Sequence, residues 1–128
     1  MNKTIFLTGI GFGCLAIILG AFGAHSLKEL LDADSLSSFE TGVRYQMYHA
    51  LFLMIIGSMN SIIQLNLKWV YYLTTVGVVF FSFSIYFLST SQLTGFEPGL
   101  LVLVTPFGGV LLITAWLLLG YRVFKQLS

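Results

Sequence analysis

The chain has 128 residues, of which 57% are hydrophobic and only 9% are charged, and its formal net charge is +1. If the 13 glycines are counted as apolar, the apolar share is about 67%, whereas soluble domains have about 45–50%. The composition therefore excludes an ordinary water-soluble core, the single cysteine excludes a disulfide scaffold, and the near-neutral charge argues against binding to nucleic acid.

Four long stretches of the sequence contain no Asp, Glu, Lys or Arg. They cover residues 4–27, 45–67, 69–96 and 98–121. A helix needs about 20 apolar residues to cross the hydrocarbon layer of a bilayer, so each stretch can cross once. The first stretch is longer than the apolar region of a typical signal peptide, about 7–15 residues, so we expect it to stay in the protein. The sequence predicts an all-α membrane protein with a single domain, residues 1–128, that forms a bundle of four transmembrane helices in the lipid bilayer.

Basic residues are unevenly distributed between the two sides that four spans define. One side carries Lys3, Lys68, Arg122 and Lys125, and the other carries Lys28 and Arg44. Because cytoplasmic loops are enriched in Lys and Arg, we expect both termini in the cytoplasm. The aromatic residues Trp69, Trp116 and Tyr121 agree with this orientation, because amphipathic rings prefer the membrane interface.

The first span carries a stripe of small residues on one helical face. The stripe consists of Gly9, Gly13, Ala16, Gly20 and Ala24, spaced three or four residues apart. In lipid, such stripes mark places where another backbone approaches closely. The neighbour is either another span of the same chain or a second copy, and we favour the same chain.

Residues 25–44 form the longest polar segment of the sequence. Ser26 and Glu29 are spaced as in a capping box, which predicts a short interfacial helix over residues 26–31 at the outer face, between spans one and two. After a turn, Asp34 or Ser35 is expected to cap the helix that becomes the second span.

The later part of the chain contains two prolines. The short loop over residues 59–68 predicts that spans two and three are antiparallel neighbours. Pro98 is expected at the first position of the fourth helix, where its missing N–H costs nothing. Pro106 is expected to kink that helix, and Gly109 to allow close packing at the bend.

Polar residues gather where the first span ends and the second begins. His25 is expected at the outer end of the first span and His49 at the outer start of the second. On a continuous helix, Tyr45 and Gln46 lie on the same face as His49. Gly42 lies one turn earlier on that face and lets a neighbouring helix pack closely. We therefore predict one connected polar site between spans one and two, made by His25, Glu40, Arg44, Tyr45, Gln46 and His49.

The chemistry of this site leaves several interpretations open. The two histidines could ligate a haem iron together, supply two ligands of a zinc or copper ion, or help to bind a polar headgroup or a quinone. Zinc requires four ligands, however, and the only cysteine, Cys14, lies deep in the first span. Alternatively the site is a structural clasp, in which Glu40 pairs with Arg44 along their helix and His25 and His49 lock two span ends together. We favour the clasp and expect neither a metal ion nor a bound cofactor.

The sequence contains no recognisable catalytic motif. GxSxG, HExxH, CxxC and phosphate-binding glycine loops are all missing from it. We therefore predict a non-enzymatic structural or accessory membrane component, which forms a homo-oligomer or serves as a subunit of a larger membrane complex. The alternative is a membrane protein that binds a small ligand or redox cofactor through His25 and His49.

Two motifs in the first half of the chain resemble a known family. Residues 20–25 read GAFGAH, and residues 41–50 read TGVRYQMYHA. In these motifs the chain resembles the YgdD family of small four-span membrane proteins, number 423 in the domain-of-unknown-function series. The resemblance extends over nearly the whole chain and implies a multi-pass protein of the bacterial inner (plasma) membrane. It implies no particular activity, substrate or cofactor, but it draws attention to the polar residues around His25 and His49.

Overall fold

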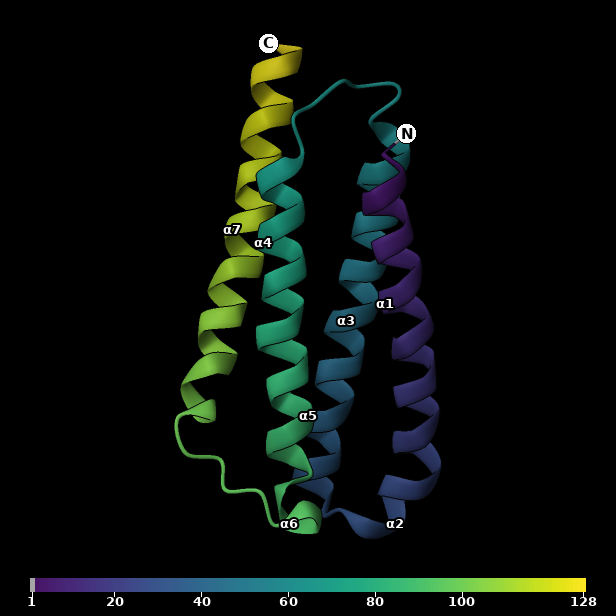
Figure 1. The fold of residues 1–128 in the computed structure, drawn as a ribbon, viewed down its shortest axis with the longest axis vertical. Helices are drawn as coiled ribbons and strands as arrows, with labels where there is room; N and C mark the ends of the chain where they lie inside the picture. The colour runs from purple at the N-terminus through teal and green to yellow at the C-terminus, as the bar shows by residue number, and fades with distance from the viewer. Residues whose placement is uncertain (1) are drawn as a thin grey trace.

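A computed structural model describes residues 2–128, which form long helices joined by short loops (Figure 1). The first helical rod consists of α1 (Lys3–Phe22), the π-helix η1 (Gly23–Leu27) and α2 (Lys28–Leu30), without a break between them. The prediction of a separate interfacial helix is therefore wrong, because residues 26–30 continue the first helix. Ser26 lies inside this rod, where it caps nothing, and the chain turns only at Leu31.

Burial explains why the first rod continues past the predicted break. Leu27 and Leu31 are 2% and 8% exposed and pack with Phe39 of the next helix in one apolar cluster. This contact holds the segment along the neighbouring helix instead of across the membrane surface. The next helix, α3, extends over Ala33–Met59. Its cap is Asp32, whose carboxylate accepts from Ser35 N at 2.7 Å, and not the predicted Asp34 or Ser35.

The second half of the chain forms two further rods. The first consists of α4 (Lys68–Val78), the π-helix η2 (Val79–Phe83) and α5 (Ser84–Ser89), and the short α6 (Ser91–Thr94) follows it. The last helix, α7, extends over Leu101–Leu127 with Pro106 in its second turn. It begins three residues after the predicted Pro98, whose carbonyl instead accepts from Leu101 N at 2.8 Å in the preceding turn.

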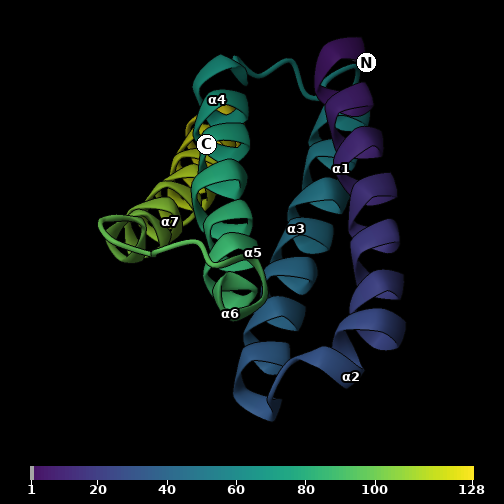
Figure 2. The same cartoon turned by 60° about the horizontal axis from the view of Figure 1, so that its bottom comes forward.

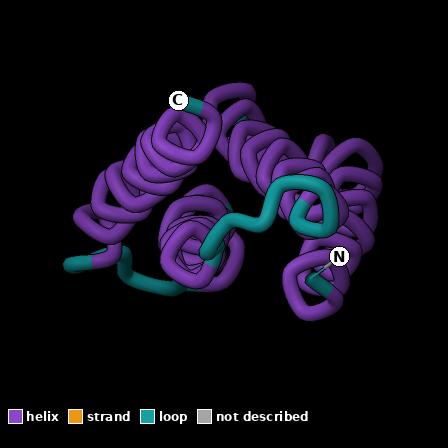
Figure 3. Tube along the Cα trace, turned by 90° about the horizontal axis from the view of Figure 1, so that it is seen from above, coloured by secondary structure: helices purple, strands orange, loops and turns teal. Residues whose placement is uncertain are grey.

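The four rods are arranged as antiparallel neighbours. In Figures 1 and 2, α1 lies along α3, α4 and α5 lie along α7, and the rod of α4 and α5 also contacts α3. Figure 3 shows α1 and α7 on opposite sides of the bundle. The start of α1, the loop between α3 and α4, and the end of α7 lie at one end of the molecule, which we call the terminal end (Figure 1).

Three segments are long and apolar enough to cross a membrane: Lys3–Leu30, Lys68–Ser89 and Leu101–Leu127. Their outer faces expose large apolar side chains, such as Ile17 (65%) and Leu117 (69%), which suits contact with lipid. The remaining long helix, α3, has the same length as α7 but carries charged and polar residues along its first half. The protein is therefore an all-helical membrane protein with at least three candidate spans among its described residues.

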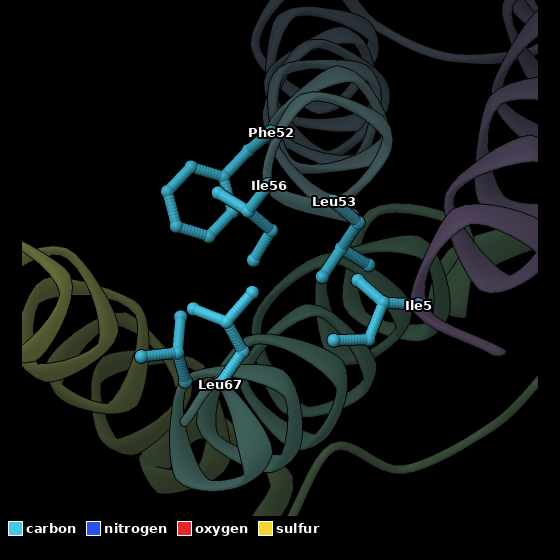
Figure 4. Close-up of a cluster of buried hydrophobic side chains, with 6 residues drawn as sticks. Ile5, Phe52, Leu53, Ile56 and Leu67 are labelled. Carbon is cyan, nitrogen blue, oxygen red and sulfur yellow. The ribbon is translucent and has the colours of Figure 1, made fainter. Parts of the chain in front are cut away.

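The main apolar cluster joins three rods near the terminal end. Figure 4 shows Ile5 of α1, Leu53 of α3 and Leu67 directly before α4 lying close together, and Phe52 and Ile56 extend this cluster along α3. Leu53 is fully buried and Leu67 is 5% exposed. The cluster therefore fixes the positions of α1, α3 and α4 relative to one another.

The small residues of α1 face α3 of the same chain. A Cβ atom on Gly9 would lie only 2.7 Å from the carbonyl oxygen of Ala50, and Gly13 and Gly20 also face α3 at distances of ordinary contact. Ala16 is buried, but Ala24 is exposed and does not belong to the packed face. The α1 backbone thus approaches α3 most closely at Gly9, where any side chain would displace a neighbour.

Glycines of the other helices permit similar approaches. A Cβ on Gly42 of α3 would lie 2.8 Å from the Tyr86 ring, and one on Gly108 of α7 would overlap the backbone of Phe81. The predicted Gly109 has more room, 3.6 Å from the Phe81 ring. Gly108, which the sequence analysis did not single out, is therefore the closer contact beside Pro106.

Candidate functional site: a polar network inside the bundle

Gln46 is the central polar side chain of the bundle. It is fully buried on α3. Its amide nitrogen donates to the carbonyl oxygen of Phe12 in α1 at 2.8 Å, and its amide oxygen accepts from the hydroxyl of Tyr86 in α5 at 2.7 Å. The orientation of the amide follows from chemistry, since a backbone carbonyl can only accept. One side chain thus connects three rods.

His49, one turn further along α3, connects this helix to α7. It is 4% exposed, and its Nδ1 lies 2.7 Å from the carbonyl oxygen of Tyr45. Its Nε2 lies 3.0 Å from the indole Nε1 of Trp116. A carbonyl only accepts and an indole N–H only donates, so the ring is the neutral tautomer with its proton on Nδ1. Both ring nitrogens are therefore occupied by partners within the protein.

The Phe52 ring packs against one side of the contact between His49 and Trp116. The Phe52 ring lies 4.4 Å from the Trp116 ring and 6.0 Å from the His49 ring, centroid to centroid. Water is thereby kept from one side of the hydrogen bond. In such surroundings a lost hydrogen bond is costly, because the orphaned group cannot turn to solvent.

Hydroxyl groups make further contacts between rods. Ser82 of η2 donates to the carbonyl oxygen of Gly42 in α3 at 2.8 Å, and Thr8 of α1 pairs with Tyr71 of α4 at 2.9 Å. Ser84 of α5 pairs with Thr105 of α7. The sequence analysis assigned no role to these serines, because hydroxyls in a helix bond equally well to their own backbone.

The structure does not join the six predicted site residues into one site, although the Tyr45 carbonyl oxygen contacts His49. Glu40, Arg44 and Tyr45 are exposed, and the Arg44 guanidinium donates to the Thr41 hydroxyl at 2.9 Å. The predicted ion pair between Glu40 and Arg44 is not present among the described residues. Of the six side chains, only Gln46 and His49 are buried. Gln46 bonds to α1 and α5, whereas His49 bonds to Tyr45 of its own helix and to Trp116 of α7.

The two histidines lie at different depths along the bundle. Gly20 faces Val43 and Gly23 faces Phe39, so His25 lies at about the level of residue 37 on α3. The twelve residues from 37 to 49 correspond to about 18 Å along a helix. The prediction that both histidines lie at the outer end is therefore wrong for His49. The charge-free stretch that contains His49 begins at residue 45, but the helix that carries His49 already begins at Ala33, so His49 lies well inside it.

This separation bears on the interpretations in which both histidines ligate one metal or haem iron. Two histidines that share one metal ion must bring their nitrogens within about 4 Å of each other. His25 is exposed and lies several turns away from His49, so the pair within one chain does not form such a site. Among residues 2–128, no group of three or more His, Cys, Asp or Glu side chains could hold a metal ion, and Cys14 is exposed on α1.

The sequence analysis missed the partners of the buried residues. Trp116 was expected at the membrane interface, and Tyr86 was not singled out. A usable signal was present: Gln46 and His49 each need a partner inside an apolar bundle, and aromatic N–H and O–H groups are natural donors there. Which ring reaches which residue depends on how the helices rotate against each other.

Comparison with known proteins places the chain among bacterial membrane proteins. Residues 19–109 match the family described as Protein of unknown function (DUF423). A UPF0382 membrane protein of Staphylococcus saprophyticus is 40% identical, covering 96% of this chain and 98% of the relative. One of Haemophilus influenzae is 35% identical, covering 99% of this chain and 98% of the relative. No solved structure matches the chain.

Proposed function

Because the chain belongs to the DUF423 family, whose relatives named above are bacterial membrane proteins, we propose that it is a non-enzymatic structural or accessory component of the bacterial inner membrane. In this proposal the whole chain is one bundle of four spanning helices. The network around Gln46 and His49 acts as the clasp that holds the helices together.

Support for a fourth span comes from the contacts of α3. A Cβ atom on Gly57 of α3 would lie 3.0 Å from the backbone nitrogen of Phe6 in α1. A Cβ atom on Gly20 of α1 would lie 3.4 Å from the side chain of Val43 in α3. The helix α3 thus follows α1 through most of its length. A helix that accompanies a membrane-crossing neighbour over this distance has to cross the same hydrocarbon layer. Its charged residues all lie in its first half: Asp34, Glu40 and Arg44.

The distribution of positive charge supports cytoplasmic termini. The terminal end of the bundle carries the four basic residues Lys3, Lys68, Arg122 and Lys125, and the opposite half carries Lys28 and Arg44. Basic residues near span ends favour the cytoplasmic side. The acidic turn around Asp32 then faces outward.

The observation that carries the structural role is the use of the buried polar groups. Gln46 binds Phe12 and Tyr86, and His49 binds Tyr45 and Trp116, so these side chains are engaged in holding helices together. A ligand that used the His49 ring would first have to displace Trp116 or break the bond to Tyr45. A clasp requires no such rearrangement.

The proposal is tested by the composition of gently purified protein. We expect a preparation without the intense haem absorption band and without a stoichiometric metal on elemental analysis, and with unchanged stability after extraction of quinones. A coloured preparation, a bound metal or a quinone that copurifies in a stoichiometric amount would instead support the redox-cofactor alternative. The His49→Gln variant serves as a reference, because a cofactor held by this ring would be lost from it.

A further inference from the structure

An apolar groove lies between α3 and α7 on the terminal half of the bundle. It has a volume of about 300 Å³. Its walls include Ile55 and Met59 of α3 and Leu119 and Val123 of α7, and Phe52 and Trp116 lie at its inner end. Figure 4 shows that Phe52 and Ile56 project from α3 on the side of Leu67, which also lines the groove.

The length of the groove corresponds to one leaflet of a bilayer. Its lining begins at Tyr48 of α3 and continues to Asn60, directly after the last residue of this helix. Twelve residues of helix rise by about 18 Å. Half of a hydrocarbon layer of about 30 Å is about 15 Å. A single extended acyl chain therefore matches the groove in both length and polarity.

A polar hollow adjoins the groove at the terminal end of the bundle. The two share Leu65, and the hollow is lined by Asn66 of the loop and by Arg122 and Lys125 of α7, among others. None of the described residues that line it is acidic. The Arg122 Nε atom is buried and finds no hydrogen-bond partner within the described chain. Two cations thus line the hollow, and one of them also has a buried nitrogen without a partner among residues 2–128.

We propose that the groove and the hollow together form a binding site for an anionic phospholipid. One acyl chain lies in the groove, and the phosphate contacts Arg122 and Lys125. Charge complementarity selects this occupant, because an arginine binds phosphate through several donors and basic pockets at span ends attract anionic headgroups. The site does not depend on the proposed structural role, since a bundle with any function in the membrane could hold such a lipid.

The fluorescence of Trp116 directly reports whether an acyl chain occupies the groove. The protein has two tryptophans, so a Trp69→Phe variant leaves Trp116 as the only emitter. This variant is reconstituted with phosphatidylcholine or phosphatidylglycerol whose acyl chains carry bromine, which quenches indole fluorescence on contact. We expect half-maximal quenching at a mole fraction at least about fivefold lower for phosphatidylglycerol, since each basic residue near the surface contributes about a fivefold preference. Equal quenching by the two lipids would overturn the proposal.

The role of the hollow is tested by charge substitutions in the same background. Arg122→Gln and Lys125→Gln should each reduce the preference for phosphatidylglycerol by about fivefold. Lys68→Gln, which removes a basic residue outside the hollow at the same end of the bundle, should leave it unchanged. Arg122→Lys keeps the charge and should retain most of the preference, which separates loss of binding from misfolding. Preference that persists in Arg122→Gln protein with normal helicity would contradict the proposal.

Two further measurements distinguish binding of a whole phospholipid from binding of an acyl chain or a phosphate group alone. Val123→Phe should fill the groove and reduce quenching by either brominated lipid, whereas Ile113→Phe, on an exposed position of α7 outside the groove, should not. Inorganic phosphate at millimolar concentration should not abolish the preference for phosphatidylglycerol. If free phosphate abolishes it, the hollow is a phosphate site and the lipid proposal is wrong.

Discussion

The indole N–H of Trp116 donates to Nε2 of His49 over 3.0 Å, across 67 positions of sequence, and joins α7 to α3 inside the bundle. Trp116→Phe keeps most of the ring but leaves the His49 nitrogen without a donor. We expect this variant to lose about 1–2 kcal/mol of unfolding free energy, measured by thermal unfolding in detergent.

Trp69→Phe is the matched control for that variant. The Trp69 ring is 56% exposed and lies beside the Tyr72 ring and the Lys68 ammonium group of its own helix, so we expect a change of less than about 0.5 kcal/mol. Trp116 is 51% exposed, so the two variants differ mainly in the hydrogen bond, and equal losses would show that this partly buried bond contributes nothing specific.

Gln46 and Tyr86 should be energetically coupled. Gln46→Leu leaves the Tyr86 hydroxyl and the Phe12 carbonyl without their partner, and Tyr86→Phe removes the other side of the same bond. We expect the double variant to be less destabilised than the sum of the single variants, by about 0.5–1.5 kcal/mol. Strict additivity in this double-mutant cycle would contradict the clasp.

The contact between α1 and α3 is tested at two glycines of the same helix. A Cβ on Gly9 would meet the Ala50 carbonyl oxygen at 2.7 Å, whereas one on Gly11 meets nothing within 4 Å. We expect Gly9→Ala to destabilise the monomer by about 1–3 kcal/mol, because the backbone of α3 has to move. Gly11→Ala should be neutral or stabilising by up to about 1 kcal/mol, because alanine favours helix.

The same pair of variants addresses self-association. If Gly9 packs within the chain, Gly9→Ala lowers the yield and melting temperature of folded protein without selectively changing its oligomeric state. A variant that stays folded but loses an oligomer on size-exclusion chromatography would place the stripe between two copies instead.

Membrane topology is tested by cysteine labelling in a Cys14→Ser background. A cysteine at Ser37, near the start of α3, should react with an impermeant maleimide applied to intact cells. A cysteine at Ser128, beyond the end of α7, should react only after the membrane is permeabilised. The reverse pattern would invert the proposed orientation, and labelling of both sites in intact cells would exclude an even number of spans.

The Asp32 cap predicts a pH dependence at the start of α3. The backbone N–H of Ser35 donates to this carboxylate and lowers its pKa below the ordinary value of 3.8. A lowered pKa in the folded state means that the ionised cap stabilises the protein above about pH 4, and that this stabilisation is lost as the pH falls through the folded pKa. Asp32→Asn keeps a capping oxygen that does not titrate. The difference in melting temperature between the two proteins should therefore be constant near neutral pH and change only below about pH 4.

Several features of the fold follow from local sequence alone. Charges are expensive in hydrocarbon, so the charge-free stretches over residues 4–27, 69–96 and 98–121 predict three of the long helical rods to within seven residues at each end, whereas α3 begins twelve residues before its stretch. The stripe around Gly9 predicts a close helix contact for an equally local reason, because its spacing follows the helical repeat. Family membership is likewise visible in the two short motifs that contain His25 and His49.

Other features depend on contacts between residues that are distant in sequence. The capping-box pattern at Ser26 suggests a helix start, but burial of Leu27 against Phe39 keeps the first rod continuous. The depth of His49 follows from the beginning of α3 at Ala33, which Asp32 and the packing of Phe39 together set.

The pairing of His49 with Trp116, and of Gln46 with Tyr86, required the tertiary structure. The charge pattern limits which segments can cross lipid, because each charge in hydrocarbon is costly wherever its helix begins and ends. It contains no information on how α7 and α5 rotate about their axes relative to α3. Close packing at Gly42, Gly77 and Gly108 sets those rotations, and with them which polar groups meet inside the bundle.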